Sequence, residues 1–163
     1  MHLQMPWSIR VALRASVVVF LAAGLVQAAG LQSLAGTWEL NVAKSRFTPG
    51  TEIKSQTRTY EVNGNEVKQS TDSVDSQGRL VHNHWVARYD GKDYPLEDNP
   101  DADTIAIKQT GELTGVTLLK KNGKVVQTVT RTLSEDGKIC TFEYKGTNAK
   151  GQKIDNLLVF ERR

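Results

Sequence analysis

The sequence contains a single cysteine, Cys140, so an internal disulfide is excluded as a source of stability. Aromatic residues make up only 7% of the chain and are scattered, which leaves no platform on which bases could stack. Neither sign of charge dominates, because 21 basic and 18 acidic side chains give a net charge of only +3. Two of the basic residues belong to an N-terminal leader, so the remainder is close to neutral. This composition excludes the usual electrostatic footprint of nucleic-acid binding, and no nucleic-acid partner is expected.

Long apolar runs are absent apart from one near the N-terminus, over residues 15–26. Two arginines precede this run and Val26-Gln27-Ala28 ends it, which is the pattern of a secretory signal peptide. A membrane anchor is the alternative, although the run is shorter than the roughly 20 residues that a spanning helix needs. We expect a signal peptide over residues 1–28, one domain over residues 29–163, and a secreted or periplasmic protein with no membrane span in its mature form.

Ten segments of β-rich sequence follow the leader, and turn signals separate nearly all of them. Asn63-Gly64, Asp90-Gly91, Asn122-Gly123 and Asp136-Gly137 each stand where alternation stops, which is typical of β-hairpins. The expected strands are residues 36–42, 52–62, 66–75, 80–90, 92–96, 104–109, 113–120, 124–133, 138–146 and 152–162. A meander this long hides its edges by closing, so we predict an all-β fold: an antiparallel up-and-down β-barrel of eight to ten strands.

Strict alternation along each strand predicts which side chains face the inside of the barrel. The expected inward residues are Val81, Asn83, Trp85, Ala87, Tyr89, Ile105, Ile107, Val125, Gln127, Val129, Arg131, Leu133, Cys140, Phe142, Tyr144, Leu158 and Phe160. Segments 52–62 and 66–75 carry hydroxyl and amide residues and have no strongly apolar face. They form either a polar wall of a partly wet cavity or a solvated flap, and the sequence leaves both possibilities open.

The segment Leu34-Ala35-Gly36-Thr37-Trp38-Glu39-Leu40 resembles the Gly-X-Trp opening of lipocalins and fatty-acid-binding proteins, together called calycins. Residues 131–133 and 136–138 resemble the late hairpin of the fatty-acid-binding group, and residues 158–162 are similar to its last strand. Residues 34–162 as a whole resemble bacterial secreted lipocalin-like proteins of unassigned ligand.

This resemblance implies structural roles for Gly36, Trp38 and Arg162, with Arg162 or Arg163 stacked on the Trp38 ring. Two departures alter what it implies for the ligand site. The fatty-acid-binding group caps its barrel mouth with a helical pair, whereas only residues 43–51 are available here, so we expect a loop and an open mouth.

The second departure concerns the carboxylate-binding pair on the last strand of that group. An Arg and a Tyr hold the ligand there, whereas this chain has Leu158 and Phe160. Arg131 would then hold an anionic group alone or together with Tyr89 or Tyr144. A lone arginine on an apolar strand face otherwise requires a glutamate from a neighbouring strand, and both alternatives remain open.

No catalytic constellation stands out in the sequence. Cys140 has the context of a buried, inert thiol rather than a nucleophile. His82 and His84 share a strand face at a metal-ligand spacing, but a third ligand is missing, so surface histidines are the favoured interpretation. The acidic segment 97–103 lacks a calcium-loop pattern and is expected to form an ordinary loop.

We therefore predict a monomeric, non-catalytic barrel that encloses a small hydrophobic ligand, with or without an anionic head group, and that needs no cofactor or metal. The expected ligand-binding residues are Trp85, Tyr89, Arg131, Phe142, Tyr144 and Phe160. One alternative is an exported protein-interaction module such as a protease-inhibitor-like barrel. An enzyme is the other, and it would depend on His82 and His84.

Overall fold

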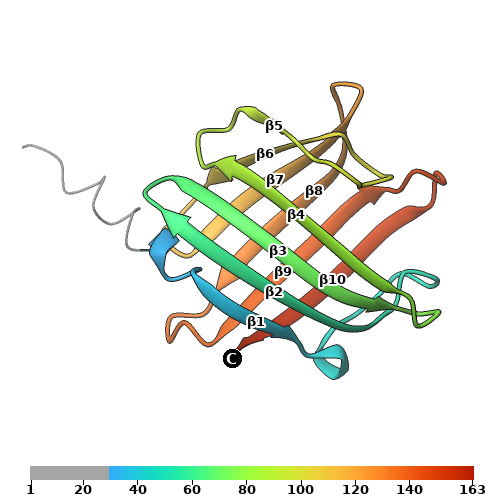
Figure 1. Cartoon of the computed structure of the whole chain (residues 1–163), viewed down its shortest axis with the longest axis horizontal. Coiled ribbons are helices and arrows are strands. Elements are labelled where there is room, and N and C mark those ends of the chain that lie inside the picture. Colours follow the sequence, from blue (N-terminus) through green and yellow to red (C-terminus); the bar gives the residue numbers. More distant parts are fainter. Residues whose placement is uncertain (1–29) are drawn as a thin grey trace, which may run out of the picture.

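The computed structural model describes residues 30–163, so the predicted signal peptide and its cleavage site lie outside the described residues. Ten antiparallel strands form one sheet in the order β4-β3-β2-β1-β10-β9-β8-β7-β6-β5 (Figure 1). Their bounds are β1 Gly36–Leu40, β2 Ile53–Asn63, β3 Glu66–Asp75, β4 Leu80–Arg88, β5 Asp93–Pro95, β6 Thr104–Gln109, β7 Thr114–Lys121, β8 Lys124–Leu133, β9 Ile139–Thr147 and β10 Lys153–Arg162. The predicted all-β meander is confirmed, because strand-forming runs alternate with Gly-containing turns along the whole described chain.

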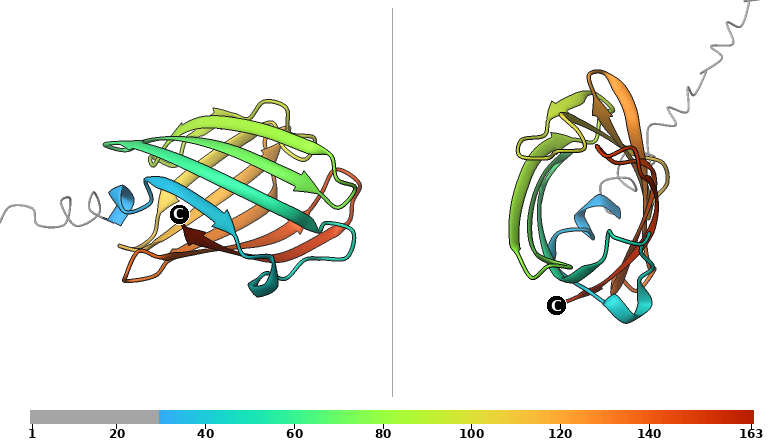
Figure 2. Two further views of the ribbon diagram at one scale, coloured as in Figure 1. Left: turned by 60° about the horizontal axis from the view of Figure 1, so that its bottom comes forward. Right: turned by 90° about the vertical axis from the view of Figure 1, so that its right-hand side faces the viewer.

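The sheet curls until its first strand pairs with its last (Figure 2). Trp38 of β1 lies opposite Arg162 of β10, and Leu40 lies opposite Phe160. The strands at the two ends of the sheet order, β4 and β5, have no ladder of hydrogen bonds between them. The barrel is therefore closed at the β1–β10 seam and nearly closed overall, with an interruption between β4 and β5.

One end of the barrel is filled by the segment that precedes β1. Residues 30–32 form a helical turn, and the side chains of Leu31 and Leu34 are buried in the core. Trp38 Nε1 donates a hydrogen bond of 2.9 Å to the Leu34 carbonyl, which holds this segment against the barrel floor. We call residues 30–35 the plug.

Arg162 fastens the plug to the C-terminal strand. Its guanidinium carbon lies 4.3 Å from the centre of the Trp38 ring, and its nitrogens donate to the carbonyls of Ser33, Ala35 and Gly137. Gly36 makes room for this group, because a Cβ at its φ of 120° would lie 2.8 Å from Arg162 Nη1. Gly36, Trp38 and Arg162 thus meet at the seam.

A β-bulge in β8 overturns the predicted orientation of Val125. Leu119 pairs with Gln127 and Lys120 pairs with Val125, so Val126 is an extra residue on β8. Beyond the bulge the alternation reverses, which leaves Val125 51% exposed while Val126 packs partly against the core. The inward prediction for Val125 was therefore wrong, although Gln127, Val129 and the residues after them follow it.

Cys140 of β9 is fully buried, and burial raises the pKa of its thiol to about 11, against the opposing effect of Arg131. At pH 8 only about one thiol in a thousand would be ionised. We expect iodoacetamide to leave Cys140 unmodified in the folded protein and to modify it in guanidinium chloride, as measured by intact-mass spectrometry. Rapid labelling without denaturant would contradict the packed wall between β8 and β10.

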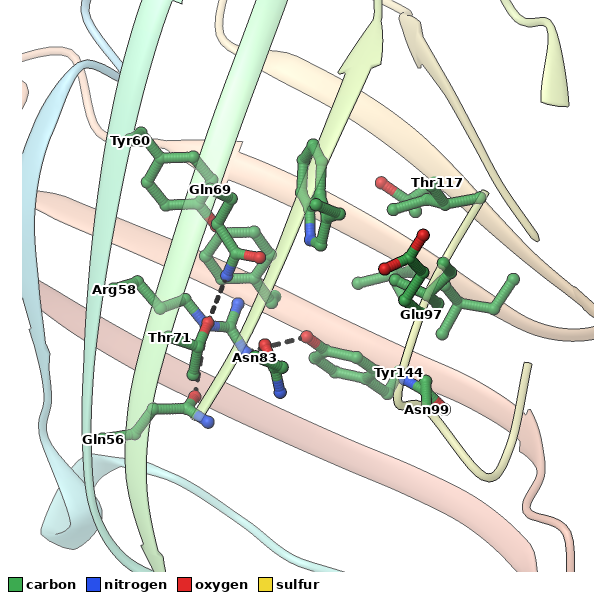
Figure 3. Close-up of a pocket in the computed structure, with 16 residues that line it drawn as sticks. Gln56, Arg58, Tyr60, Gln69, Thr71, Asn83, Glu97, Asn99, Thr117 and Tyr144 are labelled. Atoms are coloured by element: carbon green, nitrogen blue, oxygen red, sulfur yellow. Dashed lines mark hydrogen bonds between the residues drawn. The ribbon is translucent and has the colours of Figure 1, made fainter. Parts of the chain in front are cut away.

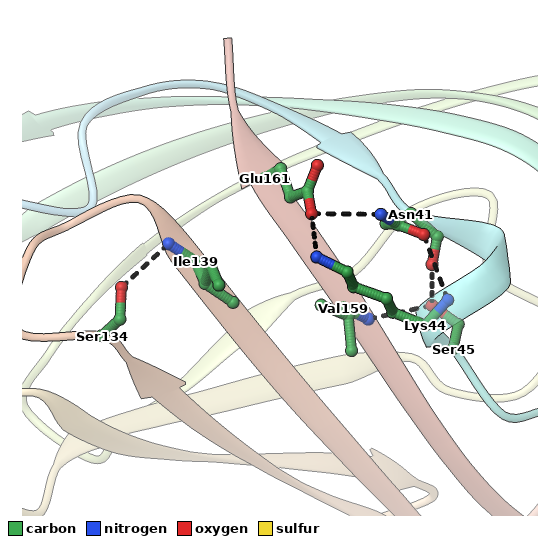
Figure 4. A network of polar contacts seen from close by, with 7 residues as sticks. All are labelled: Asn41, Lys44, Ser45, Ser134, Ile139, Val159 and Glu161. Carbon is green, nitrogen blue, oxygen red and sulfur yellow. Dashed lines mark hydrogen bonds and ion pairs between the residues drawn. The ribbon is translucent and has the colours of Figure 1, made fainter.

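The predicted loop over residues 43–51 begins with a short 3₁₀ turn, η1 (Val42–Lys44), and it packs on β10 (Figure 4). Glu161 Oε1 accepts hydrogen bonds from Asn41 Nδ2 at 3.0 Å and from Lys44 Nζ at 2.8 Å. Ser45 Oγ donates to the Asn41 carbonyl and accepts from Val159 N–H. These contacts hold the connection from β1 to β2 against the outside of the seam.

The Glu161 contacts predict an acid-sensitive contribution to stability. Lys44 and Asn41 lower the pKa of Glu161 below its ordinary value of about 4.3, so its stabilising contacts are present at neutral pH and are lost as acid protonates it. A Glu161→Gln variant should therefore melt below the wild type at pH 7, with the difference shrinking toward pH 3. Glu143→Gln, which removes only a 3.8 Å contact to Lys145, is the control. An equal difference at both pH values would contradict this role.

Candidate ligand-binding cavity

A cavity of about 150 Å³ lies inside the barrel, beyond the packed residues of the plug. Gly36 pairs with Tyr60, and the cavity extends along β2 from Tyr60 to Gln56, away from the plug. Its wall consists of Gln56, Arg58, Tyr60, Gln69, Thr71, Asn83, Trp85, Leu96, Glu97, Asn99, Ile105, Thr117, Leu119, Val129, Phe142 and Tyr144. A cavity inside the wall favours a binding barrel over a solid interaction module.

One side of the cavity is polar, and it comes mainly from β2, β3 and β4 (Figure 3). Arg58 Nε donates to Gln56 Oε1 at 3.1 Å, and Arg58 Nη2 donates to the Tyr144 hydroxyl at 2.9 Å. On β3, Gln69 Nε2 donates to Thr71 Oγ1 at 2.5 Å. The hydroxyl- and amide-rich strands are therefore a wall of the cavity and not a solvated flap.

Arg58 brings a buried positive charge to this wall. Its side chain is only 7% exposed, and it takes part in none of the ion pairs among residues 30–163. Burial works against its charged form, but Tyr144 and Tyr60 outweigh that effect and raise the pKa of Arg58 above its ordinary value. The guanidinium carbon also lies 4.4 Å from the Phe160 ring centre and 4.7 Å from that of Phe142. Arg58 thus stays charged and makes cation–π contacts with two aromatic rings, but no carboxylate neutralises it.

The polar wall has more hydrogen-bond donors than it can pair internally. Arg58 carries five N–H donors, of which Nε bonds to Gln56 and Nη2 to Tyr144, and Tyr60 is a further hydrogen-bond neighbour. The hydroxyls of Tyr144 and Thr71 each accept a bond from a neighbour, which leaves their own protons free to donate. Such a wall suits a ligand group made of acceptors, and a carboxylate or another oxyanion supplies them with the matching charge.

The opposite side of the cavity is apolar. Ile105, Leu119, Val129 and Phe142 contribute hydrocarbon surface from β6, β7, β8 and β9. Leu96, Glu97 and Asn99 reach the cavity from the loop that joins β5 to β6. Glu97 is exposed and is the acidic member of the lining, so the cavity has a cation on its buried wall and an anion at its solvent side.

Three of the six predicted ligand-binding residues line this cavity: Trp85, Phe142 and Tyr144. The other three lie elsewhere, with Phe160 and Arg131 buried and Tyr89 partly buried. Phe160 lies beneath Arg58 and packs edge-on against Phe142, with 5.6 Å between ring centres. Tyr89 and Arg131 are not among the lining residues.

Arg131 forms no ion pair with a glutamate among residues 30–163, and it does not line the cavity. Its side chain is 3% exposed, Nη2 donates to Gln109 Oε1 at 3.2 Å, and Nε and Nη1 have no partner among the described residues. Gly115 on β7 creates the space, since a Cβ there would lie 3.1 Å from Arg131 Nη2. Burial raises the pKa of the neighbouring Tyr89, and Arg131 counteracts part of that rise.

Replacing Arg131 should show how much its buried charge lowers the stability of the fold. An Arg131→Met variant keeps the aliphatic stem and removes buried donors that lack partners, so we expect the free energy of unfolding to rise by about 1 to 3 kcal/mol. Arg131→Lys, which keeps a buried charge, should lower it. Urea unfolding followed by circular dichroism measures both. A loss of stability in the Met variant would show that the contacts of Arg131, including its bond to Gln109, outweigh the cost of burying its charge.

Arg58 is the main residue that sequence reasoning missed. The available signal was the alternation of Gln56, Arg58 and Tyr60 on segment 52–62, which places one charged residue among the inward positions. Its polar neighbours concealed that signal, because they gave the strand no apolar face by which to recognise the inside.

His82 and His84 project from the outer face of β4, away from the cavity. His82 Nδ1 lies 2.7 Å from Asp72 Oδ1, and the two imidazole ring centres are 6.3 Å apart. Within residues 30–163, no three side chains of His, Cys, Asp or Glu gather in a metal-binding arrangement. In the same part of the chain, no helix has the length and apolar character of a membrane span.

Comparison with solved structures supports the fold. The zebrafish ileal bile acid-binding protein, complexed with cholic acid, matches with a TM-score of 0.50 at 11% identity, over 80% of this chain and 99% of that one. The amine-binding protein of Rhodnius prolixus, in its tryptamine complex, gives a TM-score of 0.45 at 10% identity, over 80% and 63% of the two chains. No family model matches the sequence, and no curated protein does.

At this level of identity the first comparison establishes a shared fold and nothing about the ligand. Together with the ten-stranded meander and the β1–β10 seam, it shows that the chain has the calycin barrel fold. The resemblance seen in the Gly-X-Trp opening is confirmed at the level of the fold.

Proposed function

We propose that this protein binds a small amphipathic anion inside its barrel and carries or sequesters it without altering it chemically. The observation that carries this proposal is Arg58, a buried cation with no acidic partner, on the wall of a half-apolar cavity. A buried charge without a counter-ion is costly, and the cost falls when an anionic ligand supplies one.

The two sides of the cavity contribute differently to binding. Arg58, Tyr144 and Thr71 present donors that orient the anionic group of the ligand. The apolar wall removes the rest of the ligand from water, which contributes about 25 cal/mol for each Å² of apolar surface buried. No group in this arrangement is positioned as a nucleophile with its base, so retention rather than reaction is the proposed outcome.

We further propose that the protein acts outside the cytoplasm. The support is the sequence of residues 1–28, which has the charged, apolar and small-residue regions of a signal peptide in the expected order. A single cysteine is compatible with an oxidising compartment, since it leaves no partner for internal mispairing.

A co-purified ligand would test the proposal most directly. The protein recovered from the medium or periplasm of an expressing cell is examined by native mass spectrometry, then denatured and extracted. An anionic small molecule released in stoichiometric amount is the expected result.

Titration with benzoate, a small amphipathic anion, gives a second readout. Quenching or a shift of Trp85 emission on binding is expected, and Trp85→Phe identifies the contribution of that residue. Absence of both a bound anion and any saturable anion binding would overturn the proposed function.

A further inference from the structure

We infer that the ligand is a compact monoanion of about one ring, such as an aromatic or alicyclic carboxylic acid, bound with its carboxylate at Arg58 and its ring toward the mouth. This inference rests on the proposed function and adds the size, charge and orientation of the ligand. Three independent features of the cavity carry it: its volume, its sealed inner end and the placement of its charges.

The volume of the cavity limits the ligand first. Sites for drug-sized ligands usually have about 300 to 1,000 Å³, whereas this one has about 150 Å³. A cavity of about 150 Å³ is the size that accommodates a benzene molecule. The interior therefore holds one ring with its polar substituent, and a long acyl chain does not fit.

The inner end of the cavity is sealed, so a longer ligand has no further space along the barrel axis. Beyond Arg58 and Tyr60 the interior is occupied by side chains of the core with less than 3% exposure: Leu34, Trp38, Ile107, Leu133, Cys140 and Phe160. The plug contributes Leu31 and Leu34 to this packing. Any part of a ligand that exceeds the cavity would have to project through the mouth into water, where it gains no burial.

The charges along the cavity set its orientation and its net charge. Arg58 sits on the buried wall, while Glu97 lines the cavity from the exposed loop between β5 and β6 (Figure 3). A single carboxylate therefore gains most at Arg58, where the surroundings are least screened. A second carboxylate at the opposite end of the ring would approach Glu97, so a dianion is disfavoured.

The ring of the ligand would meet a surface that suits it. Trp85 on β4 and Phe142 on β9 are aromatic members of the lining, and Val129 and Leu119 fill the wall between the polar strands and the loop. Aromatic surface contributes stacking or edge contacts beyond simple burial. The lining thus has one place for an oxyanion and one for a flat or compact apolar body.

A matched set of probes tests each feature. Calorimetric titrations use benzoate and 3-phenylpropionate, with benzyl alcohol as the neutral analogue, terephthalate as the dianion and hexadecanoate as the long-chain acid. We expect the two monoanions to bind, the alcohol and the dianion to bind about tenfold more weakly, and hexadecanoate to bind no more tightly than 3-phenylpropionate, because its extra length gains no burial.

Two variants connect the probes to the residues. Glu97→Gln should raise terephthalate binding toward the level of benzoate, with a much smaller rise for benzoate itself, whose carboxylate lies at Arg58 and farther from Glu97. Leu119→Ala enlarges the cavity and should shift the preference toward 2-naphthoate, whereas Val125→Ala, on the outer face of the barrel, should not.

The outcomes separate this inference from the proposed function. Arg58-dependent binding of hexadecanoate that is at least tenfold tighter than that of 3-phenylpropionate would overturn the size limit while leaving an anion-binding barrel in place. Equal binding of benzoate and terephthalate by the unmodified protein would overturn the role of Glu97. Failure of every acid to bind, together with no co-purified anion, would overturn both the inference and the proposed function.

Discussion

An Arg58→Met variant should lose about 10- to 100-fold in affinity for anionic ligands, because it removes charge-assisted hydrogen bonds from a desolvated site. The same variant should unfold at a temperature no lower than the wild type. Arg58 is buried without an acidic partner, so its removal relieves a desolvation penalty. The Tyr144 hydroxyl and the Gln56 amide that lose its bonds line the cavity, where water can replace it.

The pair of measurements distinguishes a ligand-binding arginine from a structural one. Affinity is measured by calorimetry with benzoate, and stability by thermal unfolding. Arg88→Met is the control, since Arg88 is exposed on the outer face of β4 and lies 3.4 Å from Glu66. A large loss of stability in Arg58→Met with unchanged binding would show that Arg58 holds the barrel together instead.

A Trp38→Ala variant should lose about 3 to 5 kcal/mol of the free energy of unfolding, the usual effect of deleting a buried aromatic side chain. Trp38 is 1% exposed, and its indole supports the plug through the bond to the Leu34 carbonyl and supports Arg162 through the ring face. Since small domains are stable by only about 5 to 15 kcal/mol, this loss removes a large fraction of the total stability.

Guanidinium unfolding followed by circular dichroism measures this loss. Trp38→Phe keeps most of the apolar contact and removes the hydrogen bond, so its loss should be about 1 kcal/mol. Trp85→Ala serves as the comparison, because Trp85 is only partly buried and lines the cavity. If Trp38→Ala and Trp85→Ala were equally destabilising, the contacts of Trp38 with the plug would not make a special contribution to stability.

Most of the fold was predicted correctly from the local sequence. The Asn-Gly and Asp-Gly turns, and the alternation between them, place every strand boundary within two residues of the observed one. Pairing of the first strand with the last also follows, since a long meander of this kind has exposed edges unless it closes. The bulge at Val126 was not predictable in this way, because an extra residue in one strand is recognised only from its partner.

The candidate site was harder to predict because it depends on which interior positions stay unfilled. Alternation correctly placed Trp85, Phe142 and Tyr144 on the inside, and the structure puts all three on the cavity wall. The same rule placed Arg131 and Phe160 inside, but other side chains pack around them. Which half of the barrel is solid depends on where Leu31 and Leu34 dock, and that contact joins segments far apart in the sequence.

The contacts of Arg162 with Trp38 and the plug affect when the chain can fold. Arg162 Nη1 contacts the Ala35 carbonyl across a sequence separation of 127 residues. A contact between residues so far apart in the sequence closes nearly the whole domain as one loop. Such closure is slow, because the chain loses conformational entropy before the contact can form and stabilise the fold. The nascent polypeptide therefore cannot complete its tertiary structure until translation of its final strand has finished.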